Sequence, residues 1–354
     1  MTSIAIVGAG TMGGTHAAYM PNLPDVRVAW VVDPERERAE AVAAPLGARV
    51  AGDIAEALAD PDLDAVMLTI PTPFHHALTL QAAAAGKHVF CEKPIALTLA
   101  DARAMTGACA MTGACARAGV QFMVGHVVRF FPEYARIGAL LAQGAIGQVG
   151  VVRAARLNAY PFVGRGWYSN FDWSGGPVLD MMIHDLDTLR WYFGEIARVY
   201  ARGLSYGPYS TSVDYALAIV RFADGVIAHV ETSWAHARFR TSIEVAGSEG
   251  ILRHASEETV ALRLERTGPP EARAGVGMPR GPLAASPYQI EFQHFLGCLA
   301  AGTPPLTGGD EATRSLAAAL AVLESIRTER PVHFVDGWPQ MPERATLSER
   351  AATA

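Results

Sequence analysis

The chain has 354 residues, which is long for a single hydrophobic core, so we expect two domains. Half of the residues are hydrophobic and 18% are charged, a composition typical of a soluble globular protein. The formal net charge is −6 and no block rich in lysine or arginine occurs. Composition and charge therefore argue against nucleic acid or an anionic membrane surface as a partner.

The N-terminal segment MTSIAIVGAG has no basic region or cleavage-type sequence, and no apolar run reaches the length of a membrane span. We therefore expect a cytoplasmic protein. The cysteines form no CxxC pair, which favours free thiols over structural zinc or a disulfide framework. They are Cys91, Cys109, Cys115 and Cys298.

Short apolar segments alternate with helix-length segments over residues 1–124, which favours a doubly wound parallel sheet. Asp53 has capping-box spacing before a helix, and Thr98 marks another helix start. The predicted strands are SIAIV (3–7), VRVAWVV (26–32), AVMLTI (65–70), HVFC (88–91) and VQFMV (120–124). The other predicted helices lie near residues 15–20, 35–47 and 73–86.

The helix before VQFMV contains a tandem repeat, MTGACA at 105–110 and again at 111–116. Six extra residues rotate the following helix face by about 240° at 3.6 residues per turn. We therefore expect a bulge, a break at Gly107 or Gly113, or an extra loop, and assign the repeat no function.

The pattern changes after residue 124, because strands then follow one another with fewer helices between them. This predicts an α+β domain with a mostly antiparallel sheet over residues 125–335, followed by a tail at 336–354. Predicted strands lie within 147–160, 197–206, 213–234 and 242–253, with a hairpin turn at FADG (222–225). Residues 265–287 are predicted to form a long loop, and residues 311–329 a helix.

GAGTMG follows the first predicted strand and fits the GxGxxG pattern with Gly8, Gly10 and Gly13. Glycine lets the backbone approach a pyrophosphate, and the N-terminus of the following helix favours an anion, so Thr11 and Met12 belong to the same predicted site. The alternative is a glycine-rich turn that binds no ligand.

Asp33 ends the second predicted strand, twenty residues after Gly13. Its carboxylate suits the ribose hydroxyls of a dinucleotide and would repel a 2′-phosphate, so NAD is favoured over NADP. Arg36 and Arg38 lie close enough in sequence to weaken that preference. The alternative for Asp33 is a turn residue before Pro34.

Three further motifs carry a resemblance to a known family. They are TPFHH (72–76), GKHVFCEKP (86–94) and SGGPVLDMMIHDLD (174–187), and VGHVVRFFPEY, GAIGQVG and GSEGILR extend the likeness over nearly the whole chain. The sequence resembles the Gfo/Idh/MocA oxidoreductases. The resemblance implies a Rossmann domain, then a domain with a large open sheet whose face often builds homodimers or homotetramers.

The resemblance also implies site residues and an activity. Family members oxidise or reduce sugars, inositols or related polyols with NAD(P), and Lys93 of the EKP motif takes the place beside the nicotinamide and the reacting hydroxyl. A lysine there stabilises a developing alkoxide; the alternative is a surface lysine after a strand. The Lys93–Pro94 peptide is expected to be cis.

Other residues of these motifs are expected near the cofactor, namely Thr72, Pro73, His76 and Glu92. His76 either reaches the cofactor or only starts a helix, and His75 is expected to be structural. Glu92 orients either the cofactor or Lys93.

Asp180, His184 and Asp187 are spaced at i, i+4 and i+7 on a helix predicted to start at Pro177, so they share one face, whereas Asp185 points elsewhere. This spacing permits a metal site, a polar helix face or a proton-transfer pair. A metal would need another protein ligand and no zinc signature is present, so we expect no metal. The resemblance implies that His184 is the general base and acid, and that Asp180 orients it or binds a neighbouring hydroxyl.

Polar residues near this helix are candidates for contact with a hydroxyl-rich substrate, although Trp167 and the nearby Trp173 also suit a core. The candidates are Arg129, Asn158, Tyr160, Trp167 and Asp172. Together these features predict an NAD(P)-dependent oxidoreductase that acts on CH–OH groups of a sugar, inositol or related polyol. The alternative is a non-redox use of the fold, either NAD-retaining glycoside hydrolysis or nucleotide sensing.

Overall fold

The computed structural model describes residues 1–114, 119–161, 166–205, 213–258, 260–266, 276–279 and 286–342. The chain divides into two compact units. The first consists of Met1–Val127 and Ala285–Thr313, and the second of Val128–Ala284 and Arg314–Ala354. The predicted boundary at 124 lies close to the point where the chain first passes into the second unit. The predicted domain over 125–335 is divided between the two units, because residues 285–313 belong to the first.

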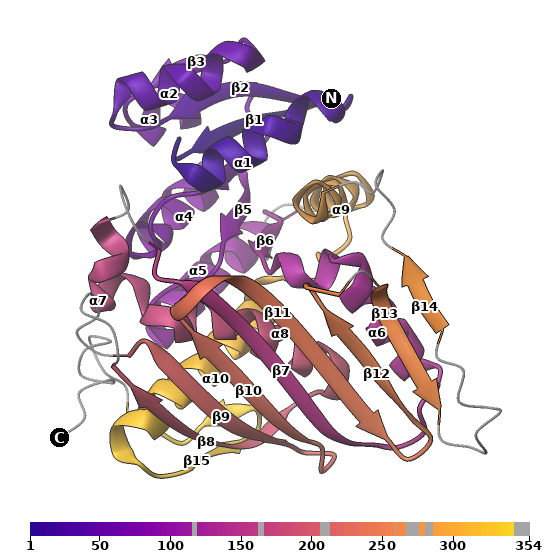
Figure 1. Cartoon of the computed structure of the whole chain (residues 1–354). Coiled ribbons are helices and arrows are strands. Elements are labelled where there is room, and N and C mark those ends of the chain that lie inside the picture. The colour runs from indigo at the N-terminus through magenta and orange to yellow at the C-terminus, as the bar shows by residue number, and fades with distance from the viewer. Residues whose placement is uncertain are drawn as a thin grey trace. The chain divides into compact units, whose positions relative to one another are not determined.

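The first unit contains a parallel six-stranded sheet in the order β3-β2-β1-β4-β5-β6, which confirms the predicted doubly wound architecture (Figure 1). The strands are added on one side of β1 up to β3 and then on its other side from β4, so the switch point lies between β1 and β4. Open α/β sheets bind ligands at such a point, outside the carboxyl ends of the strands. The strands are β1 (Thr2–Val7), β2 (Val26–Val32), β3 (Arg49–Ala51), β4 (Ala65–Leu68), β5 (His88–Glu92) and β6 (Phe122–Gly125).

Local sequence signals start the helices of this unit. The Asp53 carboxylate accepts a hydrogen bond from the backbone of Ala55 at 2.8 Å, and the Thr98 hydroxyl accepts one from Asp101 at 3.1 Å, as the capping patterns predict. The helices are α1 (Thr11–Tyr19), α2 (Arg36–Ala43), α3 (Ile54–Leu58), α4 (His75–Ala84), α5 (Leu99–Ala114) and α9 (Pro287–Ala301). Short 3-10 turns cover Met20–Asn22, Ala44–Leu46, Thr72–Phe74 and Val127–Phe130.

Helix α5 runs through the first copy of the tandem repeat and into the second. The predicted break at Gly107 or Gly113 is wrong, because both glycines lie within the continuous helix. A Cβ atom added at Gly107 would have nothing within 4 Å, so no neighbouring segment forces a bulge there. The end of the second copy, residues 115–116, lies outside the described residues.

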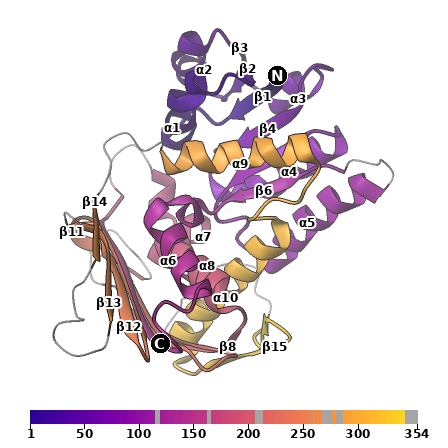
Figure 2. The same ribbon diagram turned by 90° about the vertical axis from the view of Figure 1, so that its right-hand side faces the viewer.

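Helix α9 explains why the chain returns to the first unit. Phe292 and Phe295 are fully buried, and their rings contact the ring of Phe90 at centroid distances of 5.6 and 5.8 Å. Farther along, the Thr307 hydroxyl donates to the carbonyl of Val124 at 2.7 Å. The apolar residues of 287–301 therefore complete the core around β5, and Figure 2 shows α9 beside this sheet.

The second unit contains a ten-stranded sheet in the order β14-β13-β12-β11-β7-β10-β9-β8-β15-β16 (Figure 1). Among the described strands of this sheet, only β7 and β10 pair in parallel, which confirms a mostly antiparallel sheet. The hairpin at FADG joins β9 to β10, with Gly225 at φ +99°. The strands are β7 (Val149–Ala159), β8 (Ile196–Leu204), β9 (Tyr215–Phe222), β10 (Ile227–Ser233), β11 (Ala235–Gly247), β12 (Gly250–Ala255), β13 (Val260–Arg266), β14 (Val276–Pro279), β15 (Val332–Val335) and β16 (Trp338–Pro339).

Helices cover one face of this sheet (Figure 2). They include α6 (Pro132–Ala142), α7 (Phe171–Ser174), α8 (Ile183–Phe193) and α10 (Gly309–Thr328), with a 3-10 turn at Gly166–Ser169 and a π-helical turn at Val178–Met182. The predicted loop over residues 265–287 contains the end of β13, at Arg266, and the strand β14, Val276–Pro279. These two strands pair with each other at the edge of the sheet. Within the described residues, no helix is long and apolar enough to cross a membrane.

Candidate active site

The three glycines of the GAGTMG loop have different surroundings. A Cβ atom at Gly8, whose φ is +101°, would lie 2.7 Å from the carbonyl oxygen of Thr69, and one at Gly13 would lie 1.9 Å from the carbonyl oxygen of Gly8. A Cβ atom at Gly10 would have nothing within 4 Å. The first and third glycines thus permit close packing of loop, strand and helix, and the second leaves open space beside the backbone.

Gly10 is also the N-cap residue of α1 and provides no side-chain cap, while Gly10 and Thr11 are exposed to solvent. The first N–H groups of a helix have no partner within it, and together with the helix dipole they attract an anion. The open space and the uncapped helix start therefore fit the pyrophosphate of a dinucleotide.

We predict that alanine at Gly13 lowers stability, whereas alanine at Gly10 lowers NAD affinity. Gly13→Ala should destabilise the first unit strongly, because the methyl group overlaps the backbone of Gly8. Gly10→Ala should leave the unfolding temperature nearly unchanged but lower NAD affinity about 10-fold or more, because its methyl group occupies the space open to the pyrophosphate. Thermal unfolding and NAD titration measure the two effects; equal NAD affinity in Gly10→Ala and the wild type would contradict this placement of the cofactor.

Asp33 at the end of β2 is buried, and each of its carboxylate oxygens accepts a backbone hydrogen bond. One oxygen accepts from Ala9 and the other from Glu35, both at 2.8 Å. Asp33 can therefore serve as a turn residue and also accept hydrogen bonds from ribose hydroxyls, because each carboxylate oxygen has a further lone pair. Arg36 and Arg38 pair with Glu40 and Glu35 at 2.7 and 2.9 Å, which weakens the case for NADP.

The TPFHH segment connects β4 to α4 and places its two histidines differently. The His75 ring is buried between the carbonyl oxygens of Ile70 and Pro94, each 2.9 Å away, and burial lowers the pKa of His75. His76 is partly exposed and lies 3.3 Å from the Asp101 carboxylate at the start of α5. His76 thus lies in the first turn of α4, whereas Thr72 is buried and begins the 3-10 turn that also contains Pro73.

The EKP motif lies at the carboxyl end of β5. Glu92 is buried, and one of its oxygens accepts a hydrogen bond from the backbone of Lys93 at 3.3 Å. The Lys93–Pro94 peptide is cis, as predicted. Glu92 therefore contacts the backbone of Lys93 directly.

The DMMIHDLD segment of the second unit is not the single α-helix that its spacing suggests. Pro177 precedes a π-helical turn over Val178–Met182, and α8 follows from Ile183. Asp180 therefore lies in the π turn and His184 in the α-helix, and the i, i+4 argument for a shared α-helical face does not apply to them as stated. Single π turns are frequent at functional sites.

The acidic residues of this segment fall into two classes. Asp180 is half-buried, as is His184, whereas Asp185 and Asp187 are almost completely buried. Arg156 binds the Asp185 carboxylate with two hydrogen bonds of 2.9 and 3.0 Å.

Asp187 has an equivalent arginine partner. Arg129 binds its carboxylate at 2.7 and 2.8 Å, and the hydroxyl of Ser315 donates to the same group at 2.8 Å. Two buried arginines thus neutralise the carboxylates that follow His184, and both pairs hold α8 in place.

The substrate candidates are also placed differently by the structure. Arg129 is only 3% exposed and engages Asp187, so its geometry argues for a supporting role and against substrate contact. The half-exposed candidates are Asn158, Tyr160, Trp167 and Asp172. Trp173 is 37% exposed, so its placement in a core is wrong.

Trp234 was missed by the sequence reasoning. Its buried ring contacts the rings of Tyr160 and Tyr168 at 5.3 and 6.1 Å. Trp234 directly follows β10, and its only sequence signal is its place at the end of an apolar strand. Among the described residues, no group of three or more His, Cys, Asp or Glu side chains is arranged to hold a metal ion.

Comparison with protein families gives two matches that together span most of the chain. Residues 2–126 match the Gfo/Idh/MocA oxidoreductase family with an NAD-binding Rossmann fold, and residues 134–253 match a C-terminal domain of the same family. The chain belongs to the Gfo/Idh/MocA family. Its first unit is therefore an NAD-binding Rossmann domain.

Named Gfo/Idh/MocA relatives act on sugars and inositols. The chain is 31% identical to D-apiose dehydrogenase of Paraburkholderia graminis, with 98% of this chain and 93% of the relative covered. It is 30% identical to NAD(+)-dependent scyllo-inositol 2-dehydrogenase of Bacillus subtilis, covering 93% and 95%. Among solved structures, GenD2 from gentamicin A biosynthesis in complex with NAD is 25% identical, with a TM-score of 0.82 and coverage of 94% and 96%.

Proposed function

We propose that this protein is an NAD-dependent dehydrogenase that interconverts a hydroxyl and a carbonyl group on a sugar, inositol or related polyol. The observation that carries the proposal is the contrast within DMMIHDLD, where Asp180 and His184 are partly accessible and the other two carboxylates are paired with buried arginines. The activities of the named relatives support the substrate class.

In the proposed reaction, three side chains act on the substrate. His184 accepts the hydroxyl proton during oxidation and returns it during reduction. Lys93 stabilises the negative charge that develops on the oxygen, and Asp180 orients the imidazole or binds a neighbouring hydroxyl. NAD supplies the hydride acceptor when it is bound.

The remaining proposed contacts divide between cofactor and substrate. The cofactor set is Gly8, Gly10, Thr11, Met12, Gly13, Asp33, Thr72, Pro73 and Glu92, with Glu92 acting through Lys93. The substrate set is Asn158, Tyr160, Trp167 and Asp172, whose partial exposure in the second unit supports this role.

The test is a substrate screen of the purified protein. With NAD and a panel of inositols, hexoses and branched pentoses, we expect NADH formation with at least one polyol or sugar, and much weaker turnover with NADP. Absence of NADH formation with every member of the panel, and of NADH consumption with the matching ketones, would contradict a dehydrogenase of this class.

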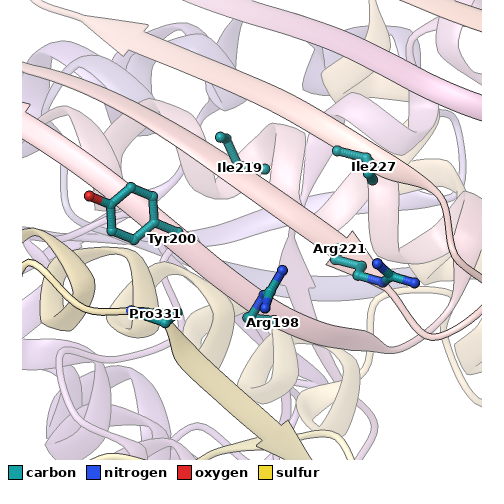
Figure 3. A pocket seen from close by; sticks show the side chains of 6 residues that line it. All are labelled: Arg198, Tyr200, Ile219, Arg221, Ile227 and Pro331. Carbon is teal, nitrogen blue, oxygen red and sulfur yellow. The ribbon is translucent and has the colours of Figure 1, made fainter.

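We further propose a homodimer or homotetramer. Residues of β9 alternate between buried and exposed, and the face away from the helices exposes Leu217 and Ile219. A depression of about 270 Å³ on this face is lined by Arg198, Tyr200, Ile219, Arg221, Ile227 and Pro331 (Figure 3). The exposed aliphatic side chains of this face favour a second copy of the chain as its cover.

Light scattering tests the assembly state. We expect a mass of at least twice the 37.6 kDa chain and a smaller mass for Ile219→Arg. A monomeric wild type at micromolar concentration would contradict the proposal. The cytoplasmic location and the absence of nucleic-acid and membrane partners stay predictions.

A further inference from the structure

His16 is a fully buried histidine that the proposed chemistry does not use. It lies on α1, six residues after Gly10, and its Nε2 atom is 2.8 Å from a carboxylate oxygen of Glu92 at the end of β5. A carboxylate only accepts hydrogen bonds when it is ionised, so Nε2 is the donor. The helix that begins at the nucleotide loop is therefore tied to the residue that precedes Lys93.

The surroundings of His16 make this contact strong and directional. The rings of Tyr19, Phe90 and Tyr288 surround the imidazole edge to face at centroid distances of 5.5, 5.6 and 5.8 Å. The Tyr19 hydroxyl lies 2.5 Å from the other ring nitrogen, Nδ1. Both nitrogens of His16 thus have partners in a site shielded from solvent, where a hydrogen bond is stronger than in water.

Glu92 remains ionised although it is buried. Burial alone opposes its ionisation, but the hydrogen bond and charge of His16, together with the nearby charge of Lys93, hold the pKa of this carboxyl below its ordinary value. One oxygen then accepts from His16, and the other accepts from the backbone N–H of Lys93. A neutral Glu92 would lose acceptor capacity at this point.

We infer that His16 is a positioning residue: it holds Glu92, and Glu92 holds the backbone and charge of Lys93 in the geometry needed for turnover. The inference rests on the proposed catalytic role of Lys93. It implies that nucleotide binding at the start of α1 and the placement of the lysine are connected through a single side chain, since His16 lies in the last turn of the short helix that begins at Gly10.

Two substitutions separate this role from simple packing. His16→Gln can place an amide N–H near the position of Nε2 and keep the donor to Glu92, whereas the shorter His16→Asn loses it. For His16→Asn we expect kcat to fall about 10- to 100-fold, as a displacement of a reacting group by about 1 Å would cause. The KM for NAD should change much less, and His16→Gln should recover most of kcat. His294→Asn on α9 of the same unit is the control, with kcat unchanged.

Two readouts do not depend on the amount of active enzyme. The deuterium isotope effect on kcat, with substrate labelled at the reacting carbon, should increase in His16→Asn, and backbone hydrogen exchange in residues 88–96 of the cofactor-free protein should become faster. Unchanged isotope effect and exchange in His16→Asn, or equal losses in both variants, would overturn the inference. If Lys93→Met abolishes turnover while His16→Asn is normal, only this inference fails; if Lys93→Met also turns over normally, the proposed role of Lys93 fails, and the inference fails with it.

Discussion

Replacing Lys93 by methionine is expected to lower kcat about 10²- to 10⁴-fold, the range found when a charge-stabilising or proton-transferring group is removed. Methionine keeps most of the unbranched stem and removes the ammonium group. Because Lys93 is partly exposed, the substitution should leave the unfolding temperature nearly unchanged. The measurement is steady-state NADH formation on the best substrate, with thermal unfolding as the check on folding.

The same prediction has a chemical test, because the chain has only two lysines, Lys87 and Lys93. The Lys87 ammonium is buried and donates to the carbonyl oxygens of Asp60 and Leu63 at 3.1 and 2.7 Å. Acetylation, which converts the ammonium group to a neutral amide, should therefore modify Lys93 before Lys87, and NAD with a substrate analogue should slow it. Rapid acetylation of Lys93 with full retention of activity would remove it from the catalytic set.

His184→Ala should produce a loss of similar size, about 10²- to 10⁴-fold in kcat. If Lys93 and His184 act in the same chemical step, the double variant should lose much less than the product of the two single losses, because effects of residues that act as a unit are not additive. Multiplicative losses would indicate that the two residues act in separate steps.

The second large effect concerns stability. Asp187→Asn should lower the free energy of unfolding of the second unit by about 3–5 kcal/mol, because it leaves the buried Arg129 without its ionised partner. Asp180→Asn, at a half-buried position seven residues earlier, should leave stability within about 0.5 kcal/mol of the wild type while reducing kcat. Denaturant unfolding and NADH formation on both variants give the comparison.

A double variant provides the control for the buried pair. Arg129→Met combined with Asp187→Leu removes both charges, so it should be more stable than Asp187→Asn alone. If Asp187→Asn is as stable as the wild type, the buried ion pair does not hold α8 as the structure implies. If Asp180→Asn is the less stable of the two single variants, the assignment of roles within DMMIHDLD is wrong.

Local sequence signals were sufficient where one short segment contains the whole physical requirement. The glycine spacing of GAGTMG predicts a strand–turn–helix. The structure shows the physical reason, because backbone atoms beside Gly8 and Gly13 leave no room for a Cβ atom. The capping residues Asp53 and Thr98 bond to N–H groups only two or three residues away. Alternation over β9 likewise determines which of its side chains are buried.

Sequence spacing did not predict the local helix type of DMMIHDLD, or the partners of its buried carboxylates, which are far away along the chain. The i, i+4 rule placed Asp180 and His184 on an α-helix, but a π turn lies between Pro177 and Ile183. Asp187 shares the predicted helix face with Asp180 and His184, yet it is buried and paired with Arg129, 58 residues away. The partner of Asp185 is Arg156, 29 residues away.

The sequence by itself determined the two architectures, the nucleotide loop and the EKP and DMMIHD motifs, because these depend on periodicity and on contiguous residues. Only the tertiary structure decided which carboxylates are accessible, which histidine of TPFHH faces Pro94, and why α9 joins the first unit. It also decided the partner of Glu92, since His16 lies 76 residues away from it. Burial and hydrogen-bond partners are properties of the packed chain, and no local pattern specifies them.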